Sequence, residues 1–111
     1  MRTALIALAL SLSAPPAEAR MERCLLEVDG VPYLLGPCNV DREKDGSFSV
    51  GTGGKGVGSP YFAYVSPNDD GTATGNWNRE RNSTHAHSGL GPLKQWGACW
   101  MNGLAKICAW P

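Results

Sequence analysis

Short apolar runs alternate with polar turns along most of the chain, and this spacing predicts β-strands. No stretch of about twelve residues repeats apolar positions three and four apart, as an amphipathic helix does. The runs are instead bounded by Gly, Pro, Asn and Asp, which is typical of strands joined by turns. Strands are expected at residues 24–28, 31–35, 47–50, 61–65, 72–78, 94–101 and 105–110.

The first two expected strands form a hairpin. Asp29-Gly30 between them is a strong two-residue turn signal, because both central positions of such a turn favour positive φ angles. Pro32 indicates an edge position or a bulge in the return strand, since proline has no N–H to donate to the ladder. Gly36-Pro37 is expected to end this hairpin.

Turn signals recur about every ten residues, which predicts the fold class. We expect an all-β domain, either an antiparallel sandwich or a small barrel of about six to eight strands. Residues 79–90 are expected to form a loop or a short irregular strand. The main alternative is a fold that carries one short helix within residues 79–93.

The N-terminal segment has the three parts of a secretory signal peptide. Arg2 supplies the positive charge, residues 4–12 form a short apolar run, and Ala17-Glu18-Ala19 is a small-x-small cleavage site. The run is well short of the roughly 20 residues that a membrane-spanning helix needs. We therefore expect residues 1–19 to be removed and residues 20–111 to form a single periplasmic or secreted domain, with no membrane insertion after cleavage.

The charge balance disfavours two classes of partner. The formal net charge is zero, and the expected cleavage removes one charge of each sign, Arg2 and Glu18. A neutral domain with dispersed charges lacks the basic surface that nucleic acid requires. It also lacks the basic cluster that binds anionic lipid. A protein or a cell-wall glycan is left as the expected partner class.

All four cysteines, Cys24, Cys38, Cys99 and Cys108, follow the expected cleavage site. An even count in a small exported chain predicts two disulfides, which offset the modest core of such a domain. The last turn can be centred on Asn102-Gly103 or on Gly103-Leu104, and only the second register places Cys99 opposite Cys108. This favours local pairing of Cys24 with Cys38 and Cys99 with Cys108. Four cysteines allow three pairings, however, and the sequence alone leaves the choice open. The spacings do not fit the paired knuckles of a zinc site.

Two short motifs match ligand-binding patterns in part, but the residues around them do not fit those binding sites. Gly51, Gly53 and Gly56 match the G-x-G-x-x-G pattern, but no helix is expected after them, so the sequence predicts a connector and no cofactor. Asp41, Glu43 and Asp45 before Gly46 resemble part of a calcium loop. The twelfth position is Thr52 rather than glutamate, so a solvated hairpin turn is the better interpretation.

The histidines and two tryptophans are the candidate functional side chains. His85 and His87 would share a face in an extended segment, which makes them candidate metal ligands. No nucleophile pattern accompanies them, so we expect a protein that is not an enzyme. Trp96 and Trp100 lie an even number of positions apart in one expected strand. If the core takes the Cys99 face, both would face outward as a contact surface.

Two segments carry a family resemblance. One runs from Cys24 through Asp29-Gly30 to Gly36-Pro37-Cys38, with Asp45-Gly46-Ser47-Phe48 after it; the other joins Gly97-Ala98-Cys99-Trp100 to residues 105–110. Together they are similar to small exported bacterial proteins of unassigned function.

The chain also resembles periplasmic inhibitors of C-type lysozyme, which are small, disulfide-bearing β-barrels. Their inhibitory loop has Ser-Gly followed shortly by Tyr; here Ser88-Gly89 is followed by Leu90 and Gly91. The resemblance implies that Ser88 and Gly89 belong to a binding loop.

Three functional hypotheses follow. The first is an exported cell-envelope binding protein, lysozyme-inhibitor-like, that acts through a loop or an aromatic face without catalysis. The second is a small metal-binding protein that uses His85 and His87. The third is a structural envelope protein whose role lies in assembly.

Overall fold

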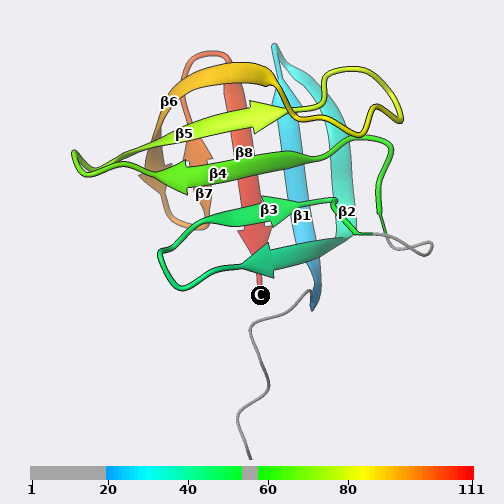
Figure 1. The fold of residues 1–111 in the computed structure, drawn as a ribbon, viewed down its shortest axis with the longest axis horizontal. Coiled ribbons are helices and arrows are strands. Elements are labelled where there is room, and N and C mark those ends of the chain that lie inside the picture. Colours follow the sequence, from blue (N-terminus) through cyan, green and yellow to red (C-terminus); the bar gives the residue numbers. More distant parts are fainter. Residues whose placement is uncertain (1–19, 54–57) are drawn as a thin grey trace, which may run out of the picture.

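A computed structural model describes residues 20–53 and 58–111, which form a closed antiparallel barrel of eight strands (Figure 1). Each strand pairs with the next along the chain, and the last pairs with the first. The strands are β1 (Arg20–Val28), β2 (Val31–Arg42), β3 (Phe48–Val50), β4 (Ala63–Pro67), β5 (Thr72–Trp77), β6 (Ser88–Trp96), β7 (Cys99–Met101) and β8 (Ala105–Trp110). The all-β prediction is confirmed, and of its two forms the barrel is the one present.

Some predictions fall outside the described residues, and others are decided within them. The expected signal peptide at residues 1–19 lies outside, as does Gly56 of the glycine-rich motif. The alternative with a helix in residues 79–93 is wrong, because this segment forms a loop that leads into β6. Within the described residues there is no helix of the length and apolarity needed to span a bilayer.

In the β1–β2 hairpin the predicted turn is confirmed, and the predicted end of the second strand is wrong. Asp29 and Gly30 have φ angles of 54° and 79°, as the two-residue turn requires. The register shifts beside Pro32, so the expected bulge is present at Tyr33. Gly36-Pro37 does not end the strand, which continues to Arg42. At Pro37, β2 pairs with β1 alone, because its pairing with β3 begins only at Val40.

Alternating side chains fill the barrel interior. Ala73 and Trp77 of β5 are buried between exposed or half-buried neighbours, as their spacing predicts. Gly75 lies between them, where a Cβ atom would come within 2.7 Å of the Leu93 side chain. A larger residue at position 75 would displace the fully buried Leu93 side chain. The buried apolar residues are Cys24, Leu26, Val28, Cys38, Val40, Phe48, Val50, Ala63, Val65, Ala73, Trp77, Leu90, Leu93, Ala105, Ile107, Cys108 and Ala109.

The segment 94–101 is two strands rather than the single strand expected. Gly97, with a φ of 63°, turns the chain so that Trp96 of β6 pairs with Cys99 of β7. Positive φ favours glycine, and a Gly-first turn suits a tight hairpin. The sequence interpretation treated Gly97 as a residue within a strand, and this error changes where Trp96 and Trp100 point.

Both disulfides form between neighbouring strands. Cys24 of β1 bonds to Cys38 of β2, and Cys99 of β7 bonds to Cys108 of β8. The second bond joins residues directly opposite in the ladder, and the turn is centred on Gly103-Leu104 as one of the two sequence registers predicted. Local pairing is thus the arrangement present. Two such bonds suit an oxidising environment of the extracellular type.

Aspartates order the β2–β3 and β4–β5 turns, which lie at the same end of the barrel. The Asp70 carboxylate accepts hydrogen bonds from the hydroxyl and the backbone N–H of Thr72, and these bonds lower the pKa of Asp70. Asp45 accepts one from the backbone N–H of Ser47, which lowers its pKa in the same way. Because both pKa values are depressed by folding, the stabilisation is present above the ordinary value of 3.8 and is lost as the pH falls through the folded values.

We predict that each disulfide contributes about 3 kcal/mol to the free energy of unfolding, because the bonds close loops with sequence separations of 14 and 9 residues. The double variants Cys24→Ala/Cys38→Ala and Cys99→Ala/Cys108→Ala should each lose about this amount in urea denaturation followed by tryptophan fluorescence. Reduced wild-type protein is the control and should match a variant that lacks all four cysteines. Losses under about 1 kcal/mol would show that the strand ladder alone holds the barrel closed.

Candidate functional site

Three connections meet at one end of the barrel and surround a pocket of about 410 Å³. They are the Asp29-Gly30 turn, the 78–87 loop and the turn at residues 102–104. The backbone N–H of Asp29 donates to the Leu104 carbonyl oxygen at 2.8 Å, which ties two of these connections together. Ser88 and Gly89, which the resemblance predicted to belong to a binding loop, are instead the first two residues of β6, and they line this pocket. Its volume is in the range of ordinary ligand pockets.

Aromatic rings underlie the pocket. Tyr33 packs against Trp77 with ring centroids 4.8 Å apart and against Tyr61 at 4.9 Å. The rings are tilted, as aromatic pairs prefer. Trp77 also pairs with Ser88 across the β5–β6 ladder. An aromatic surface therefore lies beside Ser88, although no tyrosine follows Gly89 in the sequence.

Asn78 anchors the loop that follows β5. Its side chain is only 2% exposed overall, and its amide nitrogen lies 2.9 Å from the Pro60 carbonyl oxygen, 3.1 Å from that of Ser83 and 3.2 Å from that of Glu80. Its amide oxygen accepts a hydrogen bond from the backbone N–H of Phe62 at 3.1 Å. One side chain thus joins the beginning and the middle of the loop to the chain before β4.

The anchored loop holds two arginines in solvent. Arg79 and Arg81 are exposed, and Arg79 lines the pocket together with Asp29. Arg79 and Asn82 have φ angles of 62° and 65°, which non-glycine residues adopt rarely and keep only where neighbouring contacts hold them. Among the described side chains, those of residues 21–53 and 58–111, the only ion pair within 4.0 Å is Arg42 with Glu22. Both loop arginines are therefore available to an acidic partner.

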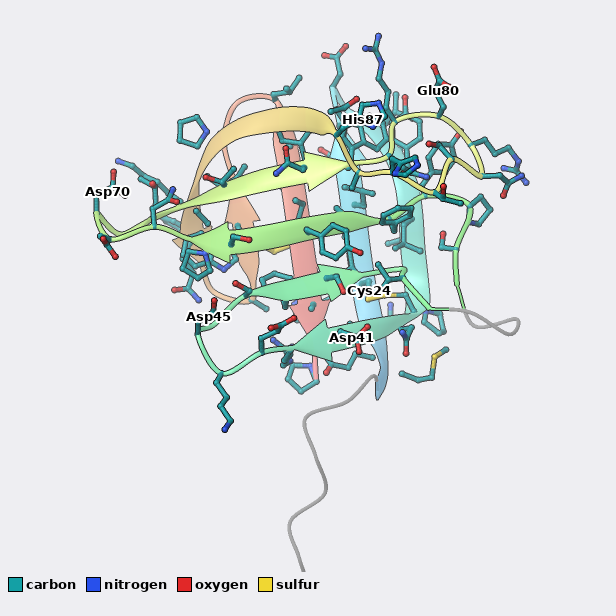
Figure 2. The ribbon with its side chains drawn as sticks, viewed as in Figure 1. Cys24, Asp41, Asp45, Asp70, Glu80 and His87 are labelled. Atoms are coloured by element: carbon teal, nitrogen blue, oxygen red, sulfur yellow. A yellow bond between two sulfur atoms is a disulfide. The ribbon has the colours of Figure 1, made fainter. Side chains whose placement is uncertain are left out.

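The two histidines lie side by side on the same loop. Their rings are 6.3 Å apart between centroids, and both side chains are exposed. Figure 2 places His87 and Glu80 on the β5–β6 loop, away from Asp45 and Asp70 on the turns at the opposite end of the barrel. The part of the chain that the structure describes contains no group of three or more His, Cys, Asp or Glu residues suited to a metal ion. Metal binding by this pair remains a prediction with two candidate ligands.

The two tryptophans do not form the shared face that was expected. Trp96 is 77% exposed on the outside of the barrel, where it pairs with Cys99. Trp100 pairs with the fully buried Ile107 and packs against the core. The prediction of one outward face is wrong because the turn at Gly97 pairs Trp96 with Cys99, and Trp100, as the next residue after Cys99, points to the opposite face of the sheet. Trp96 is left as an isolated exposed ring.

Sequence reasoning missed Asn78 and Arg79. Asn78 looked like the last polar residue of the alternating strand 72–78, and its partners Pro60 and Phe62 are 16 to 18 positions away. The only local signal was a run of polar residues rich in arginine after Trp77.

We predict that Asn78→Ala lowers the free energy of unfolding by about 3 kcal/mol, because it leaves a backbone N–H and several carbonyl groups in a largely buried region without hydrogen-bond partners. Amide hydrogen exchange across residues 79–87 should also accelerate. Asn68→Ala is the matched control: its side chain bonds only to the hydroxyls of Thr72 and Thr74, and both bonds are exposed, so the loss should stay under about 1 kcal/mol. Unchanged exchange in the Asn78 variant would mean that another contact holds the loop.

Comparison of the chain with models of known protein families, with curated proteins and with solved structures finds no match.

Proposed function

We propose that this chain is an exported, non-catalytic binding protein of the cell envelope, and that it binds a protein partner through the 79–87 loop and the adjoining pocket. Its N-terminal pattern supports export to the periplasm or the medium, and its two disulfides suit either place. The single observation that carries the proposal is the anchoring of a loop with two unpaired arginines by the buried Asn78 side chain.

Preorganisation is the physical basis of the proposal. A loop that is already held in one conformation loses little conformational entropy when it binds, and more of the interaction energy is left as affinity. Asn78 and the positive φ angles of Arg79 and Asn82 fix the path of this loop before any partner arrives. The arginines supply charge and directed hydrogen bonds at its surface.

A C-type lysozyme is the partner that this chemistry favours. Its catalytic cleft contains two carboxyl groups that flank the scissile sugar bond. The exposed side chains of Arg79 and Arg81 are complementary to such a cleft, and complementarity of charge speeds association and selects the partner. The resemblance noted for Ser88-Gly89 points to the same partner, and these residues lie beside Arg79 at the pocket.

One alternative has an observation in its favour. The proximity of the His85 and His87 rings supports a metal-binding function, with further ligands supplied by solvent or a partner. A structural role in envelope assembly is the third hypothesis, and native pull-down from the envelope separates it from the first.

We predict that the processed protein inhibits a C-type lysozyme acting on bacterial cell walls, and that Arg79→Ala raises the inhibition constant about tenfold or more, because a charged contact is lost. Arg81→Ala should act in the same direction. Arg23→Ala is the matched control, since Arg23 is exposed on β1 and pairs with Pro37 away from the loop.

The competing outcomes are distinct. Inhibition of no lysozyme class would remove the inhibitor proposal, and inhibition unaffected by either loop arginine would place the contact elsewhere. Metal retained on purification and lost from the His85→Ala/His87→Ala double variant would favour the metal-binding function instead.

A further inference from the structure

A second recessed surface lies on the side of the barrel and is centred on Tyr64 of β4. Direct strand pairing places Asp41 opposite Ser49, Ser49 opposite Tyr64, and Tyr64 opposite Asn76, so these four residues form one row across β2, β3, β4 and β5. Directly paired residues of a sheet share a face. This face is the outer one, because their strand neighbours Val40, Val50, Ala63 and Val65 are in the core.

Three residues of the row, Asp41, Ser49 and Tyr64, line a hollow of about 700 Å³, which is also bounded by residues 42–45, Thr52 and Gly53. A second hollow of about 310 Å³ is lined by Phe62 and residues 82–84, among others. Thr52, Gly53 and Tyr64 are common to both. Each volume is within the range of small-molecule sites, and the two together form an extended path over the strands.

Tyr64 presents a rigid aromatic surface in the middle of this path. The residue is 46% exposed, although it is in a strand whose alternate residues are fully buried. Phe62 contacts it edge-on, with ring centroids 5.8 Å apart and an interplanar angle of 86°. Such a contact restrains the ring and leaves much of its surface in solvent.

Polar groups beside the ring are already oriented by one another. The Thr52 hydroxyl donates to Asp41 Oδ2 at 3.1 Å and lies 3.0 Å from the hydroxyl of Ser49, which is only 3% exposed. The Asn39 amide donates to the Thr52 carbonyl oxygen at 2.7 Å and fixes its position. Among the described residues no side chain other than Thr52 donates to the Asp41 carboxylate, so acceptor positions on it face the groove unused.

From this geometry we propose that the groove binds an uncharged saccharide chain. A pyranose ring has an apolar face of C–H groups and a rim of hydroxyls. The Tyr64 ring matches the apolar face, and the Asp41 carboxylate accepts hydrogen bonds from two hydroxyls of the rim. Asn76, opposite Tyr64 on β5, adds a donor and an acceptor.

Charge and polarity argue for this class of ligand over others. Asp41, Glu43 and Asp45 line the groove and repel an anionic polymer, while the cations Arg42 and Lys44 offset them only in part. Arg42 is moreover engaged with Glu22 at 2.7 Å. A wholly apolar ligand would leave the hydroxyls and the carboxylate without hydrogen bonds. A neutral chain rich in hydroxyls can stack on the Tyr64 ring and also form hydrogen bonds with the polar groups beside it.

This proposal does not depend on the proposed function, because Asp41 and Tyr64 lie on β2 and β4 and neither hollow is lined by Arg79 or Arg81, although the second hollow reaches the same loop at residues 82–84. In Figure 2, Asp41 lies on the lower part of the barrel, well apart from Glu80 and His87, which mark that loop. Lysozyme inhibition should therefore be unchanged by substitutions at Tyr64, and saccharide binding should be unchanged by Arg79→Ala.

The test is a titration of the processed protein with a β-1,4-linked N-acetylglucosamine tetramer and with cellotetraose, followed by backbone amide NMR shifts. We expect saturable binding of at least one of them, with shifts concentrated at residues 41, 49, 52, 64 and 76. Tyr64→Ala should weaken the affinity about tenfold or more, because stacking on the ring is lost, while Tyr64→Phe should stay within about threefold. Asp41→Asn should weaken it about fivefold through loss of charge-assisted hydrogen bonds.

Trp96→Ala is the control for a non-specific aromatic contact, because Trp96 is the more exposed ring and lies on β6 and outside both hollows. Thermal unfolding of each variant establishes that the barrel is intact. The proposal is overturned by any of three results: no saturable binding of either saccharide at millimolar concentration, equal affinity of the wild type and Tyr64→Ala, or a larger loss in Trp96→Ala. Tighter binding of an anionic oligogalacturonate than of both neutral chains would also overturn it.

Discussion

Pairing of β1 with β8 closes the barrel, and every surface described above depends on that closure. An open sheet of the same strands would expose backbone N–H and C=O groups along two edges, and its short strands β3 and β7 would have little to hold them in register. The disulfides lie on either side of this seam, one between β1 and β2 and the other between β7 and β8. They reinforce the ladders next to the closing pair, and this matters because a domain of this size buries only a modest apolar core.

Closure also explains how polar residues are held at the barrel end. Where strands end, the ladder no longer satisfies backbone groups, and side chains must take over. Asn78 does so after β5, with an amide that meets backbone groups from two connections. Asn102 does so after β7, where its amide nitrogen donates to the carbonyl oxygens of Leu90 and Pro92 and its oxygen accepts from two backbone N–H groups of the following turn. Loops held in this way keep a fixed shape although they contain little apolar surface.

The sequence could predict what depends on near neighbours. Alternation marked the interior face of β5, Asp29-Gly30 marked the first hairpin, and the Cys99–Cys108 register followed from the position of one turn. It misjudged Gly97 because a glycine followed by alanine within an apolar run is a weak turn signal, and the positive φ that requires it becomes evident only in the fold. It could not reveal the row through Asp41, Ser49 and Tyr64, since that row depends on the registers of several ladders at once.

A formal charge of zero conceals a separation of charge that closure of the barrel creates. Successive connections of an up-and-down barrel alternate between its two ends, so the β4–β5 turn with Asp69 and Asp70 lies at the end opposite the β5–β6 loop with Arg79 and Arg81 (Figure 2). The β2–β3 turn, with Glu43, Lys44 and Asp45, is at the acidic end as well, whereas Glu80 and Asp29 lie with the arginines at the other end. The excess of carboxylates at one end orients the molecule in the field of a charged partner before contact, even when its net charge is nil. An acidic partner would therefore meet the arginine end first, while the acidic turns and the groove beside them remain directed away from it.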